Sequence, residues 1–435
     1  MRKNIKKLIT FTIAGFFFLI LFNQNVVNSK IFDNYSSQNF KSRVYDFNEP
    51  VNHLCASSHY DYGLKVGKRF RLQYKLLDIL SGFLNNDKVS DNEIKDQIND
   101  LERYCPFFLD ELKGLSSALN IRLEKLFSLQ NLFYSVFSGE CTATLATGKA
   151  TKNNETFLTF NLDTTASGKG IFGILLYRLF TYKSWIVSIN TLNYKYAFFG
   201  IPVIYEFPII NEKGLGWGSP GTVYNESRYI DKGPGIATMQ LEKLALMTCK
   251  NVSEVASLYK YMERACQKGE SWFHKFDGSS SSFCDKEGGI LVIEHSHNYI
   301  VTVFGNSTEI TGAREGILWH GNHHIWLDPN LTGSVIPSKY PSSRYRTDRT
   351  YELLNNSYGN ITLDTCKQIC RDHGGGSNRN EKDSYDICRH PDKNFSKVTS
   401  FAFIIQPKNM TVYWTHRSPC RSIFWKHDFS KIFGE

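Results

Sequence analysis

The chain has 435 residues, of which 41% are hydrophobic and 14% aromatic, a composition that excludes a disordered protein. This length allows one large domain or two to three ordinary ones. The formal net charge of +9 comes from lysines and arginines scattered along the chain, and their one dense cluster lies at residues 2–7. We therefore expect no nucleic-acid partner.

Residues 1–29 have the three parts of a secretory signal peptide. Residues 2–7 are basic, residues 8–22 (LITFTIAGFFFLILF) are apolar, and Ser29 offers a small residue for cleavage before Lys30. An uncleaved anchor helix is the alternative, but the apolar run is shorter than the ~20 residues that a membrane span needs. We find no later stretch long and apolar enough to span. The sequence therefore predicts a secreted or lysosome-like protein with no stable membrane span after signal removal.

Asn-x-Ser/Thr sequons support export, because they are acceptors for glycosylation in secreted proteins. An asparagine-rich composition also produces sequons by chance, so they add weight only together with the signal peptide. We expect a glycoprotein modified at some of these positions. The sequon asparagines are Asn34, Asn154, Asn225, Asn251, Asn306, Asn330, Asn355, Asn360, Asn394 and Asn409.

The chain contains ten cysteines, an even number that permits a fully paired disulfide framework. In an oxidising compartment we expect most of them to be paired, although their connectivity cannot be read from the sequence. If one cysteine is a nucleophile, at least one other must be left without a disulfide partner. The cysteines are Cys55, Cys105, Cys141, Cys249, Cys266, Cys284, Cys366, Cys370, Cys388 and Cys420.

The residues between the signal peptide and about residue 138 are predicted to be mainly helical. Residues 90–104 begin with Ser90 and Glu93 at capping-box spacing and then place apolar side chains on one face. Leucines continue with helical spacing after Pro106, and residues 122–137 form a further segment with an apolar stripe. The first part of the mature chain is thus expected to be a helical layer.

From Cys141 onward, short β-rich runs are separated by turn residues. Strands are predicted at FLTFNLD (157–163), GILLYRLF (173–180), WIVSINT (185–191) and YAFFGIPVIYEFPII (196–210). Hairpins are predicted at 286–305 and 401–416, helices at 349–356 and 363–374 (the latter ending at a glycine cap), and loops at 277–282 and 374–386. Helices followed by antiparallel strands, then helices, then strands predict an α+β layered sandwich.

Cys141 lies between a predicted helix and a predicted strand, in the stretch SGECTATLATGK. If the Glu140–Cys141 bond were cut, Cys141 would have a free α-amino group beside its thiol. That amine has a reference pKa of about 7.7 to 8.0, so it can act as the general base for its own thiol. The alternative is that Cys141 forms a disulfide, which is the more common role of one cysteine before a strand in a secreted protein.

GECTATLATGKATKNNETFLTFNLD (139–163) resembles the segment around the new N-terminus in the penicillin acyltransferase (acyl-CoA:6-aminopenicillanate acyltransferase) family. Similar segments follow in family order, from about residue 59 to residue 420. They include HYDYGLKVGKRF (59–70), LEKLFSLQNLFYSV (123–136), NEKGLGWG (211–218), LWHGNHH (318–324) and SSRYRTDRTYELL (342–354).

Members of this family are N-terminal-nucleophile (Ntn) cysteine hydrolases, made as precursors that cut themselves before the cysteine. The resemblance implies a four-layered αββα sandwich and cleavage between Glu140 and Cys141. After the predicted signal peptide (1–29), it divides the chain into a helical N-terminal chain (30–140) and a catalytic chain (141–435), with the two cleaved chains remaining associated.

The resemblance implies roles for further residues. Asn322 would supply an oxyanion-hole amide, and Asp163 would hold the protonated amine of Cys141. Asn161, on the same face of its strand as Asp163, would line the same pocket. Ser343 and Arg346 would contact substrate or support self-cleavage.

Three positions weaken or limit this correspondence. Many relatives have Arg or Gln where this chain has Phe160, which puts recognition of a substrate carboxylate or amide from this position in doubt. The family's threonine before the asparagine is Gly321 here. Arg349 is expected to be a solvated residue of a helix.

Two groups of residues could suggest a metal site, but we expect neither metal nor cofactor. The histidines of HGNHH (320–324) have no carboxylate at a convincing spacing and are expected to pack around or orient Asn322. The spacings of Cys366, Cys370, His373, Cys388 and His390 fit no common zinc site, so disulfides are favoured there.

The sequence therefore predicts an amidohydrolase or acyltransferase that acts on a C–N amide bond of a small acylated amine. One alternative keeps the fold but acts on lipids, as a lipid amidase or a phospholipase-like hydrolase. A second is a non-catalytic secreted glycoprotein with Cys141 in a disulfide. A metal-dependent hydrolase using the histidines is the third.

Overall fold

The computed structural model describes residues 45–46, 52–84, 91–136, 140–165, 185–222, 230–266, 279–334, 338, 340–374, 385–390 and 397–434. Several predictions fall outside these residues. They are the signal peptide (1–29), the capping box at Ser90, the strand at 173–180 and the sequons at Asn34, Asn225 and Asn394.

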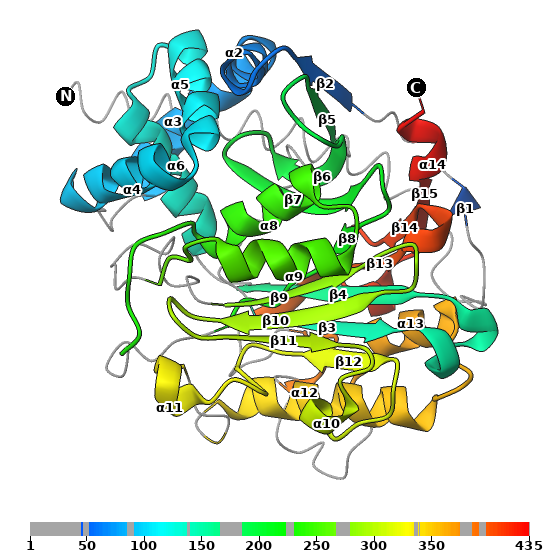
Figure 1. The fold of residues 1–435 in the computed structure, drawn as a ribbon. Helices are drawn as coiled ribbons and strands as arrows, with labels where there is room; N and C mark the ends of the chain where they lie inside the picture. Colours follow the sequence, from blue (N-terminus) through cyan, green and yellow to red (C-terminus); the bar gives the residue numbers. More distant parts are fainter. Residues whose placement is uncertain are drawn as a thin grey trace, which may run out of the picture. The chain divides into compact units, whose positions relative to one another are not determined.

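Two β-sheets form the centre of residues 45–435 (Figure 1). The seven-stranded sheet has the order β1 (Tyr45–Asp46), β15 (Trp425–Asp428), β14 (Thr411–Trp414), β13 (Lys397–Gln406), β4 (Phe157–Thr165), β3 (Cys141–Ala146) and β12 (Ile317–His320). The eight-stranded sheet has the order β11 (Ile300–Phe304), β10 (Ile290–His295), β9 (Ser280–Cys284), β8 (Gly216–Trp217), β7 (Tyr205–Asn211), β6 (Tyr196–Ile201), β5 (Trp185–Ile189) and β2 (Asn52–Ala56).

Aromatic side chains fill the space between the two sheets. Phe199 of β6 stacks on Trp414 of β14 with ring centroids 4.2 Å apart, and Phe160 of β4 lies 6.0 Å from Trp217 of β8. Because side chains alternate along a strand, Asn161 beside Phe160 points to the opposite face. The main core therefore lies between the sheets, and the polar residues of β4 face away from it.

Helices cover the outer face of each sheet. On the eight-stranded sheet these are α8 (Thr238–Thr248) and α9 (Val252–Tyr261), and on the seven-stranded sheet α12 (Pro341–Asn356) and α13 (Leu363–Cys370). Tyr259 of α9 contacts Phe283 of β9, and Tyr351 of α12 contacts Trp319 of β12. The predicted α+β class and the four-layered αββα order are confirmed.

The N-terminal segment contains the predicted helices and also contributes strands. The helices are α2 (His59–Arg69), α3 (Arg71–Leu84), α4 (Asp91–Tyr104), α5 (Pro106–Leu119) and α6 (Leu123–Val136). Strand β1 pairs with β15 and β2 pairs with β5, so this segment supplies one edge strand to each sheet. A purely helical description of residues 30–140 is therefore incomplete.

Buried charges also join the N-terminal helices to the eight-stranded sheet. Lys243 of α8 donates to Glu111 of α5 at 2.7 Å and lies 2.8 Å from Glu206 of β7. Tyr62 of α2 donates to Glu206 at 2.7 Å. All four side chains are buried, so these contacts are shielded from water.

Two further predicted elements differ in the structure. The apolar run at 196–210 is a hairpin, β6 and β7, whose turn is held by the Val203 N–H donating to the Glu206 carboxylate at 2.6 Å. Val203 has a φ of 68°, which a β-branched residue rarely adopts. Ser280 and its neighbours, expected in a loop, form β9 because β8 and β10 pair with them on both sides.

Two helix ends also differ from the prediction. The helix predicted at 349–356 begins at Pro341, so Ser343 lies inside its first turn. The helix predicted to end at a glycine stops at Cys370, with Arg371 as its C-cap. Gly374, at a φ of 63°, belongs to the chain that follows. Short helices lie at Thr308–Thr311, Pro329–Thr332 and Phe429–Ile432.

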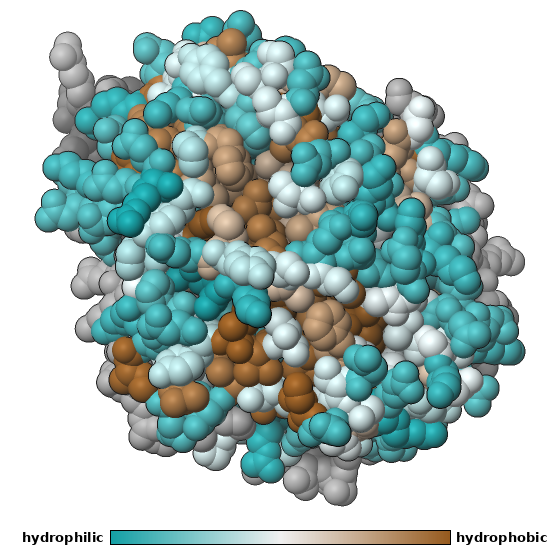
Figure 2. All heavy atoms as spheres, viewed as in Figure 1, coloured by the Kyte–Doolittle hydropathy of each residue, from teal (hydrophilic) through white to brown (hydrophobic). Residues whose placement is uncertain are grey.

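Polar residues cover most of the face seen in Figure 2, while apolar side chains gather in places, among them the region of β10 and β11. Strand β11 is the edge of its sheet and carries the partly buried Ile300, Val301 and Phe304. Across the ranges that the structure describes, no helix combines the length and apolar character required to cross a bilayer.

Candidate active site

Cys141 is the first residue of β3 and lies opposite Leu162 of β4. Its side chain belongs to the apolar core between the sheets and is 7% exposed. The next residue, Thr142, faces the other way, and its Oγ1 accepts a hydrogen bond of 2.5 Å from Arg346 of α12. The strand alternation thus turns the thiol towards the interior between the sheets.

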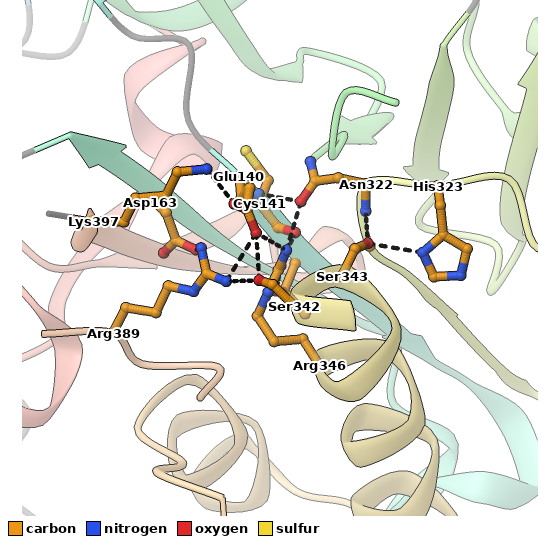
Figure 3. Close-up of polar contacts among 12 residues, drawn as sticks. Glu140, Cys141, Asp163, Asn322, His323, Ser342, Ser343, Arg346, Arg389 and Lys397 are labelled. Carbon is orange, nitrogen blue, oxygen red and sulfur yellow. Dashed lines mark hydrogen bonds and ion pairs between the residues drawn. The ribbon is translucent and has the colours of Figure 1, made fainter. Parts of the chain in front are cut away.

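The Glu140–Cys141 peptide bond makes a hydrogen bond at each of its two polar atoms, and Figure 3 shows the side chains around it. The backbone N–H of Asp163 donates to the Glu140 carbonyl oxygen at 2.8 Å. The N–H of Cys141 donates to Oδ1 of Asn322 at 2.9 Å. A donor on a carbonyl oxygen stabilises negative charge that develops there during nucleophilic attack.

Asn322 follows β12 and is completely buried. Its own N–H donates to Ser343 Oγ at 2.6 Å, and its Nδ2 donates to the carbonyl oxygen of Gly221 at 2.7 Å. The structure places the amide oxygen of Asn322, and not its NH2 group, against Cys141. In the intact chain Asn322 therefore accepts a hydrogen bond, whereas its predicted role was that of a donor.

Ser343 links the backbone of Asn322 to His323. Its Oγ lies 2.8 Å from Nδ1 of His323, and burial lowers the pKa of His323 to about 3. A neutral imidazole accepts the Ser343 proton, which leaves the oxygen of Ser343 free to accept from Asn322. At Gly321, a Cβ atom would lie 2.5 Å from Thr347 Oγ1, so only glycine fits where α12 packs against this loop.

Arg346 is the central cation of the site and is fully buried. Its Nη1 donates to the carbonyl oxygen of Cys141, and its Nη2 donates to Glu140 Oε2 and to Asn322 Oδ1, both at 2.8 Å. One guanidinium thus contacts both residues of the peptide bond and the asparagine that holds it. The rigid fork of an arginine suits such multiple contacts.

The Glu140 side chain lies in a cage of basic and hydroxyl groups that we had not predicted from the sequence. Arg389 Nη2 lies 2.8 Å from Glu140 Oε2, Ser342 Oγ donates to the same oxygen at 2.6 Å, and Lys397 Nζ contacts Oε1. Arg389 and Lys397 are far from Glu140 in the sequence, so no local pattern points to this contact.

Burial and charge set the protonation states around the peptide bond. Burial and the Asp163 carboxylate raise the pKa of the Cys141 thiol, against the lowering effect of Arg346. Although burial opposes ionisation, the charges of Arg389 and Arg346 hold the pKa of Glu140 well below its usual range. Cys141 is therefore a thiol and Glu140 a carboxylate at neutral pH.

Asp163 lies next to the peptide bond, but its carboxylate contacts other groups. Thr399 Oγ1 donates to it at 2.6 Å and Arg389 Nη1 lies 3.4 Å away, while burial raises the pKa of Asp163. Asn161 shares the face of β4 with Asp163, as predicted. Its Nδ2, however, donates to the carbonyl oxygens of Cys370 and Ile387 at 2.9 and 3.0 Å. Asn161 therefore holds the end of α13, and its amide N–H groups are not directed at Cys141.

All ten cysteines lie in described residues and carry thiols in the structure. The disulfide framework stays a prediction, and the structure gives no pairing for Cys141. Arg349, expected to be solvated, is half-buried and pairs with Asp372 at 2.9 Å.

The histidines near Asn322 do have a carboxylate beside them, contrary to the expectation from sequence. Glu294 of β10 is completely buried and lies 2.7 Å from Nε2 of His320. The Glu294 carboxylate also accepts three backbone N–H groups, from Ile325, Trp326 and Leu327, at 2.6 to 2.9 Å. Sequence spacing could not reveal this contact, because Glu294 lies on the opposite sheet. With its oxygens occupied, Glu294 holds the chain that follows Asn322.

Replacing Glu294 by glutamine should destabilise the protein in a pH-dependent way. Burial opposes ionisation, but hydrogen bonds from His320 and the backbone lower the pKa of Glu294 from 4.5 to about 2. Its stabilisation is therefore present above pH ~4.5 and is lost as the pH falls towards ~2. The difference between the folded and unfolded pKa of Glu294 corresponds to about 3 kcal/mol of stability, which Glu294→Gln should remove at pH 7.

Urea unfolding of both proteins between about pH 2 and pH 7 measures this difference. Glu287→Gln, an exposed change on the same hairpin, should change the free energy of unfolding by less than about 0.5 kcal/mol. Wild type and Glu294→Gln curves that run parallel over this pH range would contradict the assignment.

No family model matches the sequence, and no curated protein does. Among solved structures, penicillin V acylase from Agrobacterium tumefaciens is similar with a TM-score of 0.37 and 13% identity, over 63% of this chain and 83% of that chain. Two variants of conjugated bile acid hydrolase from Clostridium perfringens are similar with TM-scores of 0.37 and 0.38 and identities of 13% and 14%, over 66% of this chain and 93% of theirs. Similarity at this level says nothing about what this chain binds or converts.

Proposed function

We propose that this chain is the precursor of an Ntn-type amidohydrolase or acyltransferase that cuts itself between Glu140 and Cys141. The observation that carries the proposal is the doubly held peptide bond, with the Asp163 N–H on the carbonyl oxygen and Asn322 on the departing nitrogen. A buried peptide bond before a strand has no structural need for a cage of three cations around the preceding side chain.

In the self-cleavage step, Sγ of Cys141 attacks the carbonyl carbon of Glu140. The C–S bond forms, the C–N bond breaks, and the thiol proton ends on the nitrogen, which becomes the α-amine of Cys141. Water then hydrolyses the thioester, which leaves a main-chain carboxylate at Glu140 and regenerates the thiol of Cys141. The Asp163 N–H stabilises the oxyanion of this step.

In the mature enzyme, the same thiol attacks the amide carbonyl of a small acylated amine. The α-amine of Cys141 takes the thiol proton and passes it to the leaving amine, and Asp163 orients that amine. In the intact chain the NH2 group of Asn322 donates to Gly221, so after cleavage the amide must turn this group towards Cys141 to serve the substrate oxyanion. Water completes hydrolysis, whereas a second amine would complete acyl transfer.

A lipid amide or ester is the second candidate substrate. The interior neighbours of Cys141 are apolar: Leu162 lies opposite it, and Phe160 packs on Trp217 and Phe403. Residue 160 is a phenylalanine and not a basic residue, so this side of the site suits an apolar acyl chain better than a charged one.

The two chains would remain together after cleavage. The segment before Cys141 supplies β1 and β2 to the two sheets, and its Glu111 pairs with the buried Lys243. The proposal of a secreted or lysosome-like glycoprotein is supported by the seven described sequon asparagines, since none of these seven is buried.

Purified secreted protein tests the proposal directly. We expect two fragments on a reducing gel, one beginning at Cys141, that co-elute under native conditions. Hydrolysis of chromogenic acyl amides should be lost after thiol alkylation, and a series of acyl lengths should separate small acylated amines from lipid amides. An uncut chain, or hydrolysis that survives alkylation, would sink the proposal.

A further inference from the structure

Four side chains with metal-binding atoms meet at a place that the proposed reaction does not use. They are His373 and His390 with Cys388 and Cys420, here called the Cys2His2 cluster. One ligand atom from each lies within 4.8 Å of all the others. They come from three segments: the chain after α13, residues 385–390, and the 3-10 turn Pro419–Arg421.

We propose that the Cys2His2 cluster binds a structural zinc ion. A tetrahedral zinc with Zn–S of about 2.3 Å and Zn–N of about 2.0 Å places its ligand atoms roughly 3.3 to 3.8 Å apart. In the cluster, His390 Nε2 lies 3.1 Å from Cys420 Sγ and 4.0 Å from Cys388 Sγ. Small side-chain movements therefore complete the site.

The surroundings of the cluster favour a metal over a simple disulfide. Asp386 Oδ2 lies 3.7 Å from Nδ1 of His373, so a carboxylate stands beside one of the two imidazoles, as carboxylates commonly do beside metal-binding histidines. The His373 and His390 rings stack, with centroids 5.1 Å apart, and a ligand atom of each lies within 4.8 Å of both sulfurs. A disulfide between Cys388 and Cys420 would not explain why two imidazoles lie beside the two sulfurs.

Zinc binding conserves both charge and protons. Zinc displaces the proton of each thiol, two protons leave to solvent, and the two thiolates neutralise the ion. With four protein ligands the coordination is closed, so the ion would be structural and take no part in acyl chemistry.

The position of the cluster gives the ion a function. Arg389, which lies between two of the ligands, reaches Glu140 in the cage described above. The backbone of this segment is held on both sides, since Cys388 N–H donates to Asp372 at 2.9 Å and Arg389 N–H donates to Thr399 Oγ1 at 2.8 Å. Zinc would fix the segment that delivers Arg389 to the cage.

Metal analysis of the full chain tests the inference. We expect one zinc per chain, falling to the level of a metal-free blank in His390→Gln and Cys420→Ser. Asp386→Asn should weaken zinc affinity by about 10- to 100-fold. His53→Gln and Cys55→Ser, both at exposed positions of β2, are matched controls that should keep the metal.

Cobalt replacement in the wild-type chain avoids variants that fail to fold, and should give the visible and thiolate charge-transfer bands of a tetrahedral site. The measurement also works on uncut Cys141→Ala protein, so it is independent of the proposed function. A Cys388–Cys420 disulfide in peptide mapping, full zinc content in His390→Gln, or reduced wild-type protein without zinc would each overturn the inference.

Discussion

Cys141→Ala yields an intact, uncut chain, and its amidase activity falls by at least about 10⁴-fold. The substitution removes the sulfur that attacks the Glu140 carbonyl carbon, so no thioester forms and the α-amine is never released. In other hydrolases, removal of a nucleophile that acts together with its base lowers the rate by at least about this factor. The substitution removes only the sulfur atom, so the fold should persist.

Intact mass and N-terminal sequencing measure the cut, and thermal unfolding checks that the variant is folded. Cys141→Ser is the matched variant: it keeps a nucleophile of similar size, but its hydroxyl loses a proton less readily than a thiol does. We expect Cys141→Ser to cut slowly and incompletely. A Cys141→Ala chain that is still cut before residue 141 would show that an outside protease makes the cut.

Arg346→Ala should both destabilise the protein and slow self-cleavage. The fully buried guanidinium contacts Glu140, the Cys141 carbonyl oxygen and Asn322. Removing it leaves the buried charge of Glu140 with fewer cationic partners and should lower the free energy of unfolding by about 3–5 kcal/mol. The peptide bond and Asn322 lose their shared anchor, so cleavage should slow by about 10²-fold or more.

Arg346→Lys separates these two effects, because it keeps the charge but cannot make all three contacts at once. We expect it to recover much of the stability and little of the cleavage rate. Arg349→Ala on the same helix is the control: its ion pair is partly exposed, so its loss should cost no more than about 1 kcal/mol. Denaturant unfolding and the rate of fragment appearance provide the measurements. Cleavage of Arg346→Ala at the wild-type rate would remove Arg346 from the mechanism.

Much of the fold was predictable because the patterns that set it are local. The spacing of apolar residues placed α4 and α5 correctly, and strand-like runs placed β4, β5 and the β13–β14 hairpin. The alternation along β4 correctly put Asn161 and Asp163 on one face. The hairpin at 196–210 was missed because the run is apolar almost throughout, although Gly200 and Pro202 lie at its turn, where the Val203 N–H donates to Glu206.

The sequence by itself determined the position of Cys141, at the junction of a helical and a β-rich region, and the α+β class, since both follow from residues close along the chain. Tertiary structure decided what surrounds the Glu140–Cys141 bond. Arg346, Arg389 and Lys397 are more than 200 positions from Glu140, and only the packing of α12, residues 385–390 and β13 beside β3 and β4 brings them together. Such long-range contacts depend on sheet order and register, which no local pattern specifies.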